Sequence, residues 1–189
     1  MKKLLLVTLI ASLTSSLAGC FPVVATGVGA GVIMADDRRT SGTFVEDQGI
    51  DIKASNRIGE QLKDQVHINV NSFNRNVLMT GEAPTEALRS QAESIIQSVP
   101  NVNRVVDEVA IAGPSSFSSR SNDTYLTTKV KARMIDAQKF NANHVKVITE
   151  AGTVFLMGLV THKEAEDATE IARTTSGVLR VVKIFEYLD

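Results

Sequence analysis

An internal repeat constrains the fold of this chain more than any other feature of its sequence. Residues 77–81 (Val-Leu-Met-Thr-Gly) match residues 154–158 (Val-Phe-Leu-Met-Gly), which lie 77 positions later. Residues 102–106 (Val-Asn-Arg-Val-Val) match residues 178–182 (Val-Leu-Arg-Val-Val) at an offset of 76. Self-similarity at a nearly fixed spacing means that one structural unit is written twice. We therefore expect two copies of the same small domain.

The repeat and the composition around it divide the chain into five segments. We expect a signal peptide at 1–19, a lipidated tether at 20–48, a first domain at 49–112, a linker at 113–121 and a second domain at 122–189. The linker begins Gly-Pro-Ser-Ser, and these residue types are typical of loops. Each domain is small, and domains of this size bury only ~60% of the surface of the unfolded chain.

The first twenty residues carry an export signal with a lipidation site. Lys2 and Lys3 precede an apolar run, Leu4–Leu17, that is shorter than the ~20 residues needed to span a bilayer and is typical of a signal peptide. Leu-Ala-Gly then precede Cys20, the only cysteine of the chain, as in the bacterial lipobox. Cys20 is therefore the expected lipid anchor, carrying diacylglycerol and palmitate, and two or more acyl chains hold a protein stably on a membrane. Phe21 rather than aspartate follows it, which favours the outer membrane, with the domains facing the periplasm.

The first copy has the pattern of a helix, two strands, a second helix and a third strand. Asp51 is the predicted N-cap of a helix whose apolar residues recur every four positions. Residues 74–76 (Asn-Arg-Asn) form a predicted turn between two strands. Pro84 and Thr85 begin the second helix, which ends before Pro100, and the last strand follows.

The second copy repeats this order of elements. Asp123 is the predicted N-cap of its first helix, Ala151 and Gly152 form the turn between its strands, and Thr161 with Glu164 forms a capping box. The chain is therefore predicted to be α+β, with two tandem αββαβ domains. Each domain is expected to hold a three-stranded mixed sheet with two helices on one face.

The composition excludes several classes of function. Once Lys2 and Lys3 are removed, 18 basic residues stand against 21 acidic ones, so no basic field surrounds the chain to bind nucleic acid. A single cysteine excludes an intramolecular disulfide framework and a cysteine-based zinc site. His67, His144 and His162 show neither metal-ligand spacing nor a nucleophile beside them. We therefore expect no enzyme activity, no metal and no cofactor.

The combination of a lipobox with two αββαβ units resembles the BON-domain family. Each copy carries a Val-x-Leu-x-Gly-like second strand and a Val-x-x-Val third strand. The resemblance is strongest at 121–124, 127–130 and 154–161, and it is to the dual-BON outer-membrane lipoproteins. It implies a non-enzymatic role in envelope integrity and a second domain that binds anionic phospholipid, phosphatidylglycerol or cardiolipin, through its first helix. The implied contact residues are Tyr125, Thr128, Lys129, Lys131, Arg133 and Ile135.

The residues themselves leave this lipid contact open. At about 100° per residue, an inward face of Leu126, Val130 and Met134 turns Ile135 toward solvent, beside lysines and Tyr125. Such a mixture is typical of a helix at a membrane surface. The alternative is that Ile135 ends the helix and packs into its own domain or against the first copy, and that the lysines are only solvated. The family carries tryptophan where this chain has Tyr125, a weaker interfacial aromatic.

A comparison of the two copies assigns extra positive charge to the second. If Asp51 corresponds to Asp123, three basic residues of the second copy's first helix align with one basic and two uncharged residues of the first copy. Lys129, Lys131 and Arg133 then align with Arg57, Gly59 and Gln61. The second copy would gain two basic residues, each adding ~1 kcal/mol of attraction to an anionic membrane surface.

A protein-interaction adaptor for envelope assembly or cell division is the alternative function. The linker at 113–121 is short enough for the two domains to dock on each other, and exposed sheet edges can recruit a strand from a partner. Envelope proteins would then be the partners. An adaptor would keep its function without Lys131 and Ile135, which separates it from a lipid-binding protein.

Overall fold

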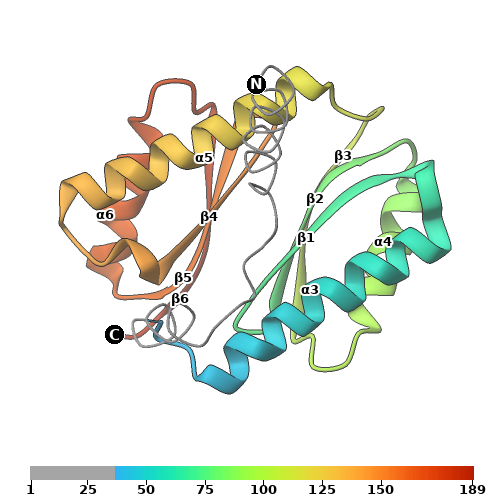
Figure 1. Ribbon diagram of the computed structural model, residues 1–189, viewed down its shortest axis with the longest axis horizontal. Helices are drawn as coiled ribbons and strands as arrows, with labels where there is room; N and C mark the ends of the chain where they lie inside the picture. The colour runs from blue at the N-terminus through green and yellow to red at the C-terminus, as the bar shows by residue number, and fades with distance from the viewer. Residues whose placement is uncertain (1–36) are drawn as a thin grey trace, which may run out of the picture. The chain divides into compact units, whose positions relative to one another are not determined.

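The computed structural model describes residues 37–189 (Figure 1). The expected signal peptide, the lipid anchor Cys20 and the first part of the expected tether lie outside the described residues. Both domains belong to one compact unit. Within residues 37–189, no helix is long and apolar enough to cross a membrane.

The same five elements occur in each copy. The first domain consists of α3 (Ser41–Leu62), β1 (His67–Phe73), β2 (Asn76–Ala83), α4 (Glu86–Gln97) and β3 (Arg104–Ile111). The second domain consists of α5 (Phe117–Ala137), β4 (Val145–Glu150), β5 (Thr153–Val160), α6 (His162–Arg173) and β6 (Arg180–Tyr187). One short 3-10 helix follows α3 (Lys63–Gln65) and another precedes β4 (Ala142–His144). The predicted order of elements is confirmed.

Each domain has one three-stranded sheet, with the second strand of the copy in the middle. β2 pairs antiparallel with β1 and parallel with β3, and β5 pairs in the same way with β4 and β6. Both helices of a domain cover the same face of its sheet, where apolar side chains from helices and strands form one core per domain (Figure 1). The predicted α+β fold, with mixed sheets and two helices on one face, is confirmed.

The other face of each sheet packs against the other domain. Every residue of β2 is buried, because one face of this strand meets the helices and the other meets the second sheet. The core between the sheets consists of Phe73, Leu78, Phe155, Met157 and Ile184. Polar contacts cross the same boundary: Asn76 donates to Glu186 (2.8 Å) and Asn69 donates to Glu150 (2.8 Å). The two domains therefore share a hydrophobic core.

Both first helices begin earlier than the sequence predicts. Their N-caps are Thr40 and Ser116, whose hydroxyls accept hydrogen bonds from the backbone N–H three residues later. The prediction of Asp51 and Asp123 as caps is wrong. The first turns of both helices are rich in polar residues, so the four-residue apolar spacing starts only where each helix meets its sheet. α3 and α5 thus begin inside the segments expected as tether and linker.

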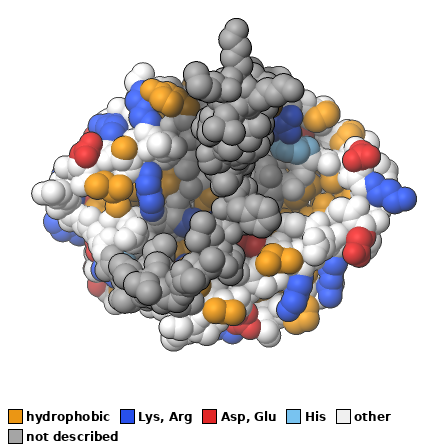
Figure 2. Space-filling model, viewed as in Figure 1, with side chains coloured by type: hydrophobic (Ala, Val, Ile, Leu, Met, Phe, Trp, Pro, Cys, Tyr) orange, Lys and Arg blue, Asp and Glu red, His pale blue; other side chains and the backbone are white. Residues whose placement is uncertain are grey.

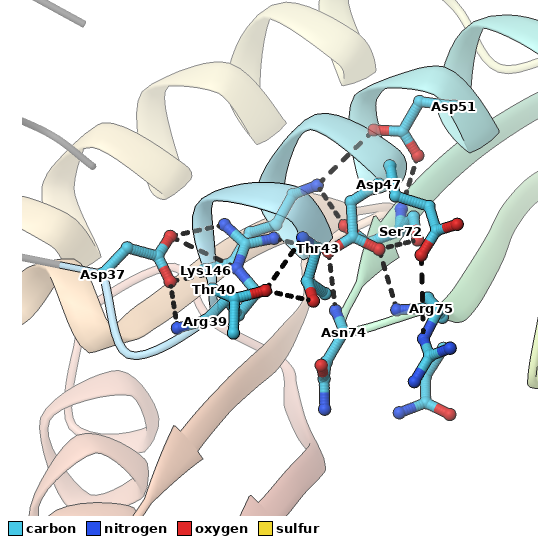
Figure 3. Close-up of polar contacts among 12 residues, drawn as sticks. Asp37, Arg39, Thr40, Thr43, Asp47, Asp51, Ser72, Asn74, Arg75 and Lys146 are labelled. Carbon is cyan, nitrogen blue, oxygen red and sulfur yellow. Dashed lines mark hydrogen bonds and ion pairs between the residues drawn. The ribbon is translucent and has the colours of Figure 1, made fainter. Parts of the chain in front are cut away.

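A buried aspartate in the first helix holds the turn of the hairpin that follows. Asp47 accepts hydrogen bonds from the backbone N–H groups of Asn74 (2.8 Å) and Arg75 (2.7 Å) (Figure 3). It also accepts one from the hydroxyl of Ser72 (2.6 Å). Backbone groups in a tight turn have no partner in the strand ladder, so a buried acceptor beside the turn satisfies them. The helix and the hairpin are therefore joined by hydrogen bonds as well as by apolar packing.

The second domain repeats this arrangement. Asp123 accepts hydrogen bonds from the backbone N–H groups of Ala151 (2.9 Å) and Gly152 (2.8 Å). Both turn residues have positive φ, 47° and 73°, as a two-residue type I′ turn requires. Asp47 lies 76 residues before Asp123 and has the same role, so these two aspartates are equivalent and Asp51 is not part of the pair.

The residues that precede α3 bind the second domain. Arg38 donates two hydrogen bonds to the carboxylate of Glu164 (2.6 and 2.8 Å) and one to the carbonyl of Leu159 (3.0 Å). We call residues 37–40 the N-terminal strap. The strap lies between the expected lipid anchor, Cys20, and α3 in the chain. Its contacts attach this part of the chain to the second domain, which carries α5.

The pair of Arg38 and Glu164 predicts a pH-dependent contribution to stability. The hydrogen bonds from Arg38 lower the pKa of the Glu164 carboxyl from its ordinary value of 4.5 to about 2. A carboxylate whose pKa is lowered by folding stabilises the folded state above its unfolded pKa, and this stabilisation is lost as the pH falls through the folded pKa. Arg38→Gln should therefore lower the free energy of unfolding by about 1–2 kcal/mol at pH 7, as measured in urea. The difference from the parent should shrink at pH 3.

Arg173→Gln is the matched control for this prediction. Arg173 pairs with Glu170 on the exposed surface of α6, where an ion pair is worth about 0–1 kcal/mol. A difference between Arg38→Gln and the parent that stays constant from pH 7 to pH 3 would contradict the assignment to Glu164.

Candidate functional site on helix α5

Helix α5 has one face buried in the core and one exposed face with apolar side chains. Leu126, Val130 and Met134 are buried, as predicted. Tyr125 and Ile135 are each 60% exposed. Figure 2 shows hydrophobic side chains beside Lys and Arg side chains on the face of the molecule that carries α5. The alternative in which Ile135 packs into its own domain or against the first copy is therefore wrong.

Two of the three basic residues predicted as lipid contacts hold the end of α6. Lys129 donates to the carbonyl of Ser176 (3.0 Å), and its Nζ lies 5.6 Å from the centroid of the Tyr125 ring. Arg133 donates to the carbonyl of Ile171 (2.9 Å) and to threonine hydroxyls beside it. Carbonyls at the C-terminal end of a helix carry partial negative charge and attract cations. Lys129 and Arg133 therefore have a structural role in positioning α6.

The third basic residue, Lys131, is bound to the backbone next to β4. Its ammonium donates to the carbonyls of Ala142 (2.8 Å) and Val145 (2.7 Å). Burial lowers the pKa of this ammonium group. An acidic substitution at this position would leave two carbonyls without a donor and place a negative charge beside them. Loss of binding in such a variant would therefore report a damaged fold as readily as a lost lipid contact.

The repeat shows that Arg133 belongs to the fold. The buried residues of the two first helices correspond at an offset of 76: Asp47, Ile50, Ala54 and Ile58 with Asp123, Leu126, Val130 and Met134. Arg133 therefore corresponds to Arg57, which donates to the carbonyl and the hydroxyl of Ser98 (both 3.0 Å) at the end of α4. Among the three predicted contacts the gain of two basic residues is wrong, because Lys129 and Arg133 correspond to Lys53 and Arg57 and only Lys131, in place of Ser55, is new.

Two exposed apolar side chains of α5 have no counterpart at the matching positions of α3, although α3 exposes Val45 and Ile52 elsewhere. At the offset of 76, Tyr125 and Ile135 stand where α3 has Gly49 and Gly59. Thr128 is exposed between them, and its hydroxyl donates to a backbone carbonyl one turn earlier (3.0 Å). The second domain thus presents an aromatic ring and a branched aliphatic side chain where the first domain has no side chain at all.

The histidines of the chain contact neighbouring side chains. His67 and His162 lie 2.9 and 2.8 Å from carboxylate oxygens of Glu82 and Asp189. His162 also stacks on Tyr187, with the ring centroids 4.1 Å apart. In the part of the chain that the structure describes, no group of three His, Cys, Asp or Glu residues is placed to hold a metal ion.

Comparison with known proteins assigns the family. The model of the BON domain matches residues 47–113 and 122–189. The chain belongs to the BON-domain family. Outer membrane lipoprotein DolP of Haemophilus influenzae is 37% identical over 178 residues, which cover 93% of this chain and 92% of that protein.

Two further relatives match over most of their length. The 21 kDa hemolysin of Actinobacillus pleuropneumoniae is 32% identical over 155 residues, covering 81% of this chain and 80% of that protein. Osmotically-inducible protein Y of Escherichia coli is 27% identical over 161 residues, covering 82% of this chain and 80% of that protein. With two BON domains and this similarity, the chain is an outer-membrane lipoprotein of the dual-BON type.

Proposed function

We propose that this lipoprotein binds anionic phospholipid through the exposed face of α5 and thereby supports the integrity of the outer membrane. One observation carries the proposal: Tyr125 and Ile135 are each 60% exposed at positions where the first domain has Gly49 and Gly59. An exposed aliphatic side chain and an aromatic ring on one helix face are typical of a helix that lies in the plane of a membrane interface.

Charge near this face favours an anionic bilayer. The ammonium of Lys129 lies over the Tyr125 ring and makes one hydrogen bond, to a carbonyl at the end of α6. A cation next to an interfacial ring adds ~1 kcal/mol near an anionic surface. Phosphatidylglycerol and cardiolipin are the anionic lipids that we propose as ligands.

The expected anchor at Cys20 makes a weak second contact sufficient. A protein held on the bilayer by acyl chains meets headgroups at a high effective concentration, so the helix needs little affinity of its own. In this account the domains face the periplasm. The similarity to an outer membrane lipoprotein supports a role at the cell envelope.

Substitution of Ile135 tests the proposal. In the mature chain with Cys20→Ala, which cannot be lipidated, Ile135→Glu should weaken binding to phosphatidylglycerol vesicles at least ~10-fold. The change removes an apolar contact worth about 1.5–3 kcal/mol and adds a repelled charge. Co-sedimentation at two salt concentrations measures the effect, and vesicles of phosphatidylcholine alone should bind poorly.

The first domain offers a matched control. Ile52 on α3 is 61% exposed, so Ile52→Glu makes the same chemical change on an equally exposed helix position. It should leave binding unchanged. Equal loss in both variants, or no binding by the parent, would reject the α5 face as the lipid contact and favour the adaptor function.

A further inference from the structure

A polar cleft of about 380 Å³ lies between α5 of the second domain and strands β1 and β4. We call it the polar cleft, and its lining includes His67, Asn69, Asn71, Arg120, Thr127 and Glu150. The buried carboxylate of Asp123 also lines it, and both oxygens of this carboxylate already accept hydrogen bonds from the turn N–H groups of Ala151 and Gly152. None of the contacts described above on the exposed face of α5 uses these side chains. The cleft is therefore a feature separate from the Tyr125 and Ile135 face, although α5 contributes to both.

A second cleft has the corresponding location with the two domains interchanged, so that its helix comes from the first domain. It lies between α3 and β4, measures about 250 Å³, and is lined by Arg39, Phe73 and Lys146 among others. The guanidinium of Arg39 lies 4.1 Å from the centroid of the Phe73 ring and pairs with Asp47 at 2.7 Å (Figure 3). The chain's own strap thus places an arginine side chain into this cleft.

The polar cleft has no such internal occupant. The two N-caps, Thr40 and Ser116, lie 76 residues apart, so Ser115 of the linker corresponds to Arg39 of the strap. A serine side chain is too short to reach where an arginine reaches. The wall of the polar cleft therefore lacks, at this position, the long cationic side chain that Arg39 contributes to the wall of its counterpart.

One end of the polar cleft presents a cation with free N–H groups. Within residues 37–189, Arg120 forms no ion pair, and its guanidinium contacts only Nε2 of His67, at 3.4 Å. Nδ1 of His67 lies 2.9 Å from the buried carboxylate of Glu82, which can only accept, so Nδ1 carries a proton and Nε2 faces Arg120. A guanidinium with unused donors in a fixed plane favours a bidentate anion such as a phosphate or a carboxylate.

The rest of the cleft presents groups that bind hydroxyls. Asn69 donates to Glu150 (2.8 Å) and keeps its amide oxygen as an acceptor. The hydroxyl of Thr127 bonds to that of Thr149 (2.7 Å), and the amide of Asn71 also lines the cleft. Amides, hydroxyls and a carboxylate together recognise a ligand with several hydroxyl groups. An anionic group beside a polyol therefore matches the whole cleft.

The position of the cleft on α5 relates it to the membrane. Arg120, Thr124 and Thr128 lie on successive turns of the helix, and Thr128 belongs to the exposed face. Phe117, at the start of the helix, is 80% exposed and lies five turns from Ile135 on the same side. A bilayer that contacts this side of α5 would bring its headgroups to the mouth of the cleft.

We infer that the polar cleft binds the phosphoglycerol headgroup of an anionic phospholipid, with the phosphate on Arg120 and the glycerol hydroxyls on Asn69, Asn71 and Glu150. This inference rests on the proposed function and assigns it a headgroup site. The exposed face of α5 supplies apolar contact with the bilayer, and the polar cleft selects the headgroup. A headgroup without hydroxyls leaves the amides of the cleft without partners and binds less tightly.

The test uses the full lipidated chain in neutral detergent micelles, titrated with soluble glycerophosphoglycerol and followed by NMR. Side-chain signals of Arg120, His67 and Asn71 should shift together, and Arg120→Gln should raise the dissociation constant at least ~10-fold. Arg104→Gln, which removes an exposed arginine at the start of β3, should leave it unchanged. No shift in the parent, or equal weakening by both variants, would overturn the inference.

Two further comparisons complete the test. One distinguishes a lipid headgroup from free phosphate as the ligand, and the other distinguishes failure of the polar cleft from failure of the α5 face. Inorganic phosphate should bind more weakly than glycerophosphoglycerol, and equal binding of the two would overturn the headgroup assignment. On vesicles, Arg120→Gln should reduce the preference for phosphatidylglycerol over phosphatidylserine, which carries the same net charge. Ile135→Glu should weaken vesicle binding and leave the soluble titration unchanged, so failure of the cleft and failure of the α5 face give different results.

Discussion

Gly81→Ala is expected to lower the free energy of unfolding by about 4 kcal/mol, enough to unfold much of the protein at 37 °C. Gly81 lies in the middle strand β2 with φ of +109°, which side chains rarely adopt. A methyl group there would lie 2.0 Å from the carbonyl oxygen of His67. The carbonyl is a backbone group of the paired strand β1, so the sheet itself must shift to admit the methyl group. Urea unfolding followed by circular dichroism measures the loss.

The repeat supplies a second instance, and α3 supplies a control. At Gly158 of β5 a methyl group would lie 2.4 Å from the carbonyl oxygen of His144, so the same His and Gly spacing recurs for the same steric reason. Gly59 has nothing within 4 Å of such a methyl group, and Gly59→Ala should raise the stability by about 0.5–1 kcal/mol. A Gly81→Ala variant that is as stable as the parent would refute the steric account.

Asp47→Ala is expected to lower the free energy of unfolding by about 3–5 kcal/mol. The carboxylate is fully buried and accepts hydrogen bonds from Asn74, Arg75 and Ser72. Its removal leaves buried donors without a partner, and it leaves the guanidinium of Arg39 without one of its two carboxylates. Native-state hydrogen exchange should show the turn N–H groups losing protection first.

Two variants serve as comparisons for Asp47→Ala: one replaces the same carboxylate by an amide, and the other removes an exposed aspartate elsewhere. Asp47→Asn keeps an acceptor for the turn and should cost less than the alanine variant. Asp136→Ala changes an exposed residue of α5 and should alter the stability by less than ~0.5 kcal/mol. If Asp136→Ala and Asp47→Ala were equally damaging, the hairpin contacts would not explain the effect.

The fold of each domain could be predicted from the sequence because its signals are local. The capping box of Thr161 and Glu164 occurs as predicted, since a cap depends on residues three positions apart. The second helix of the first copy begins at Glu86, next to the predicted start at Pro84 and Thr85, with Thr85 as its N-cap. The turns at 74–76 and 151–152 occur where predicted, and each contains a residue that tolerates positive φ, Asn74 in the first and Gly152 in the second. The inward face of α5 followed from its four-residue spacing.

Docking of the two domains was considered because of the short linker, but packing of one sheet on the other was not predicted, although a signal for it is present. Residues 77–79 and 154–157 are continuous apolar runs, which are typical of strands buried on both faces. The pattern was interpreted only as the second strand of a two-layer domain. What covers the second face depends on contacts between residues about 77 positions apart in the chain, and no local pattern specifies such a partner.

The candidate site could be predicted in part. The exposure of Ile135 followed from periodicity, but the partners of Lys129, Lys131 and Arg133 did not, because each donates to a backbone carbonyl more than ten residues away in the chain. Because every residue has a backbone carbonyl, the sequence does not indicate which carbonyl a side chain binds. The true start of α5 was missed as well, and with it the exposed Phe117 and the residue Arg120.

The most direct test of the central claim is the depth of α5 at the membrane. Ile135→Cys and Ile52→Cys each introduce one thiol into the lipidated chain, in which the proposed lipid anchor at Cys20 would leave no other free thiol. Each new thiol is labelled with an environment-sensitive fluorophore. In phosphatidylglycerol vesicles the label at 135 should shift to the blue and resist an aqueous quencher, while the label at 52 should remain fully accessible. Two labels with the same emission and the same accessibility would contradict the account.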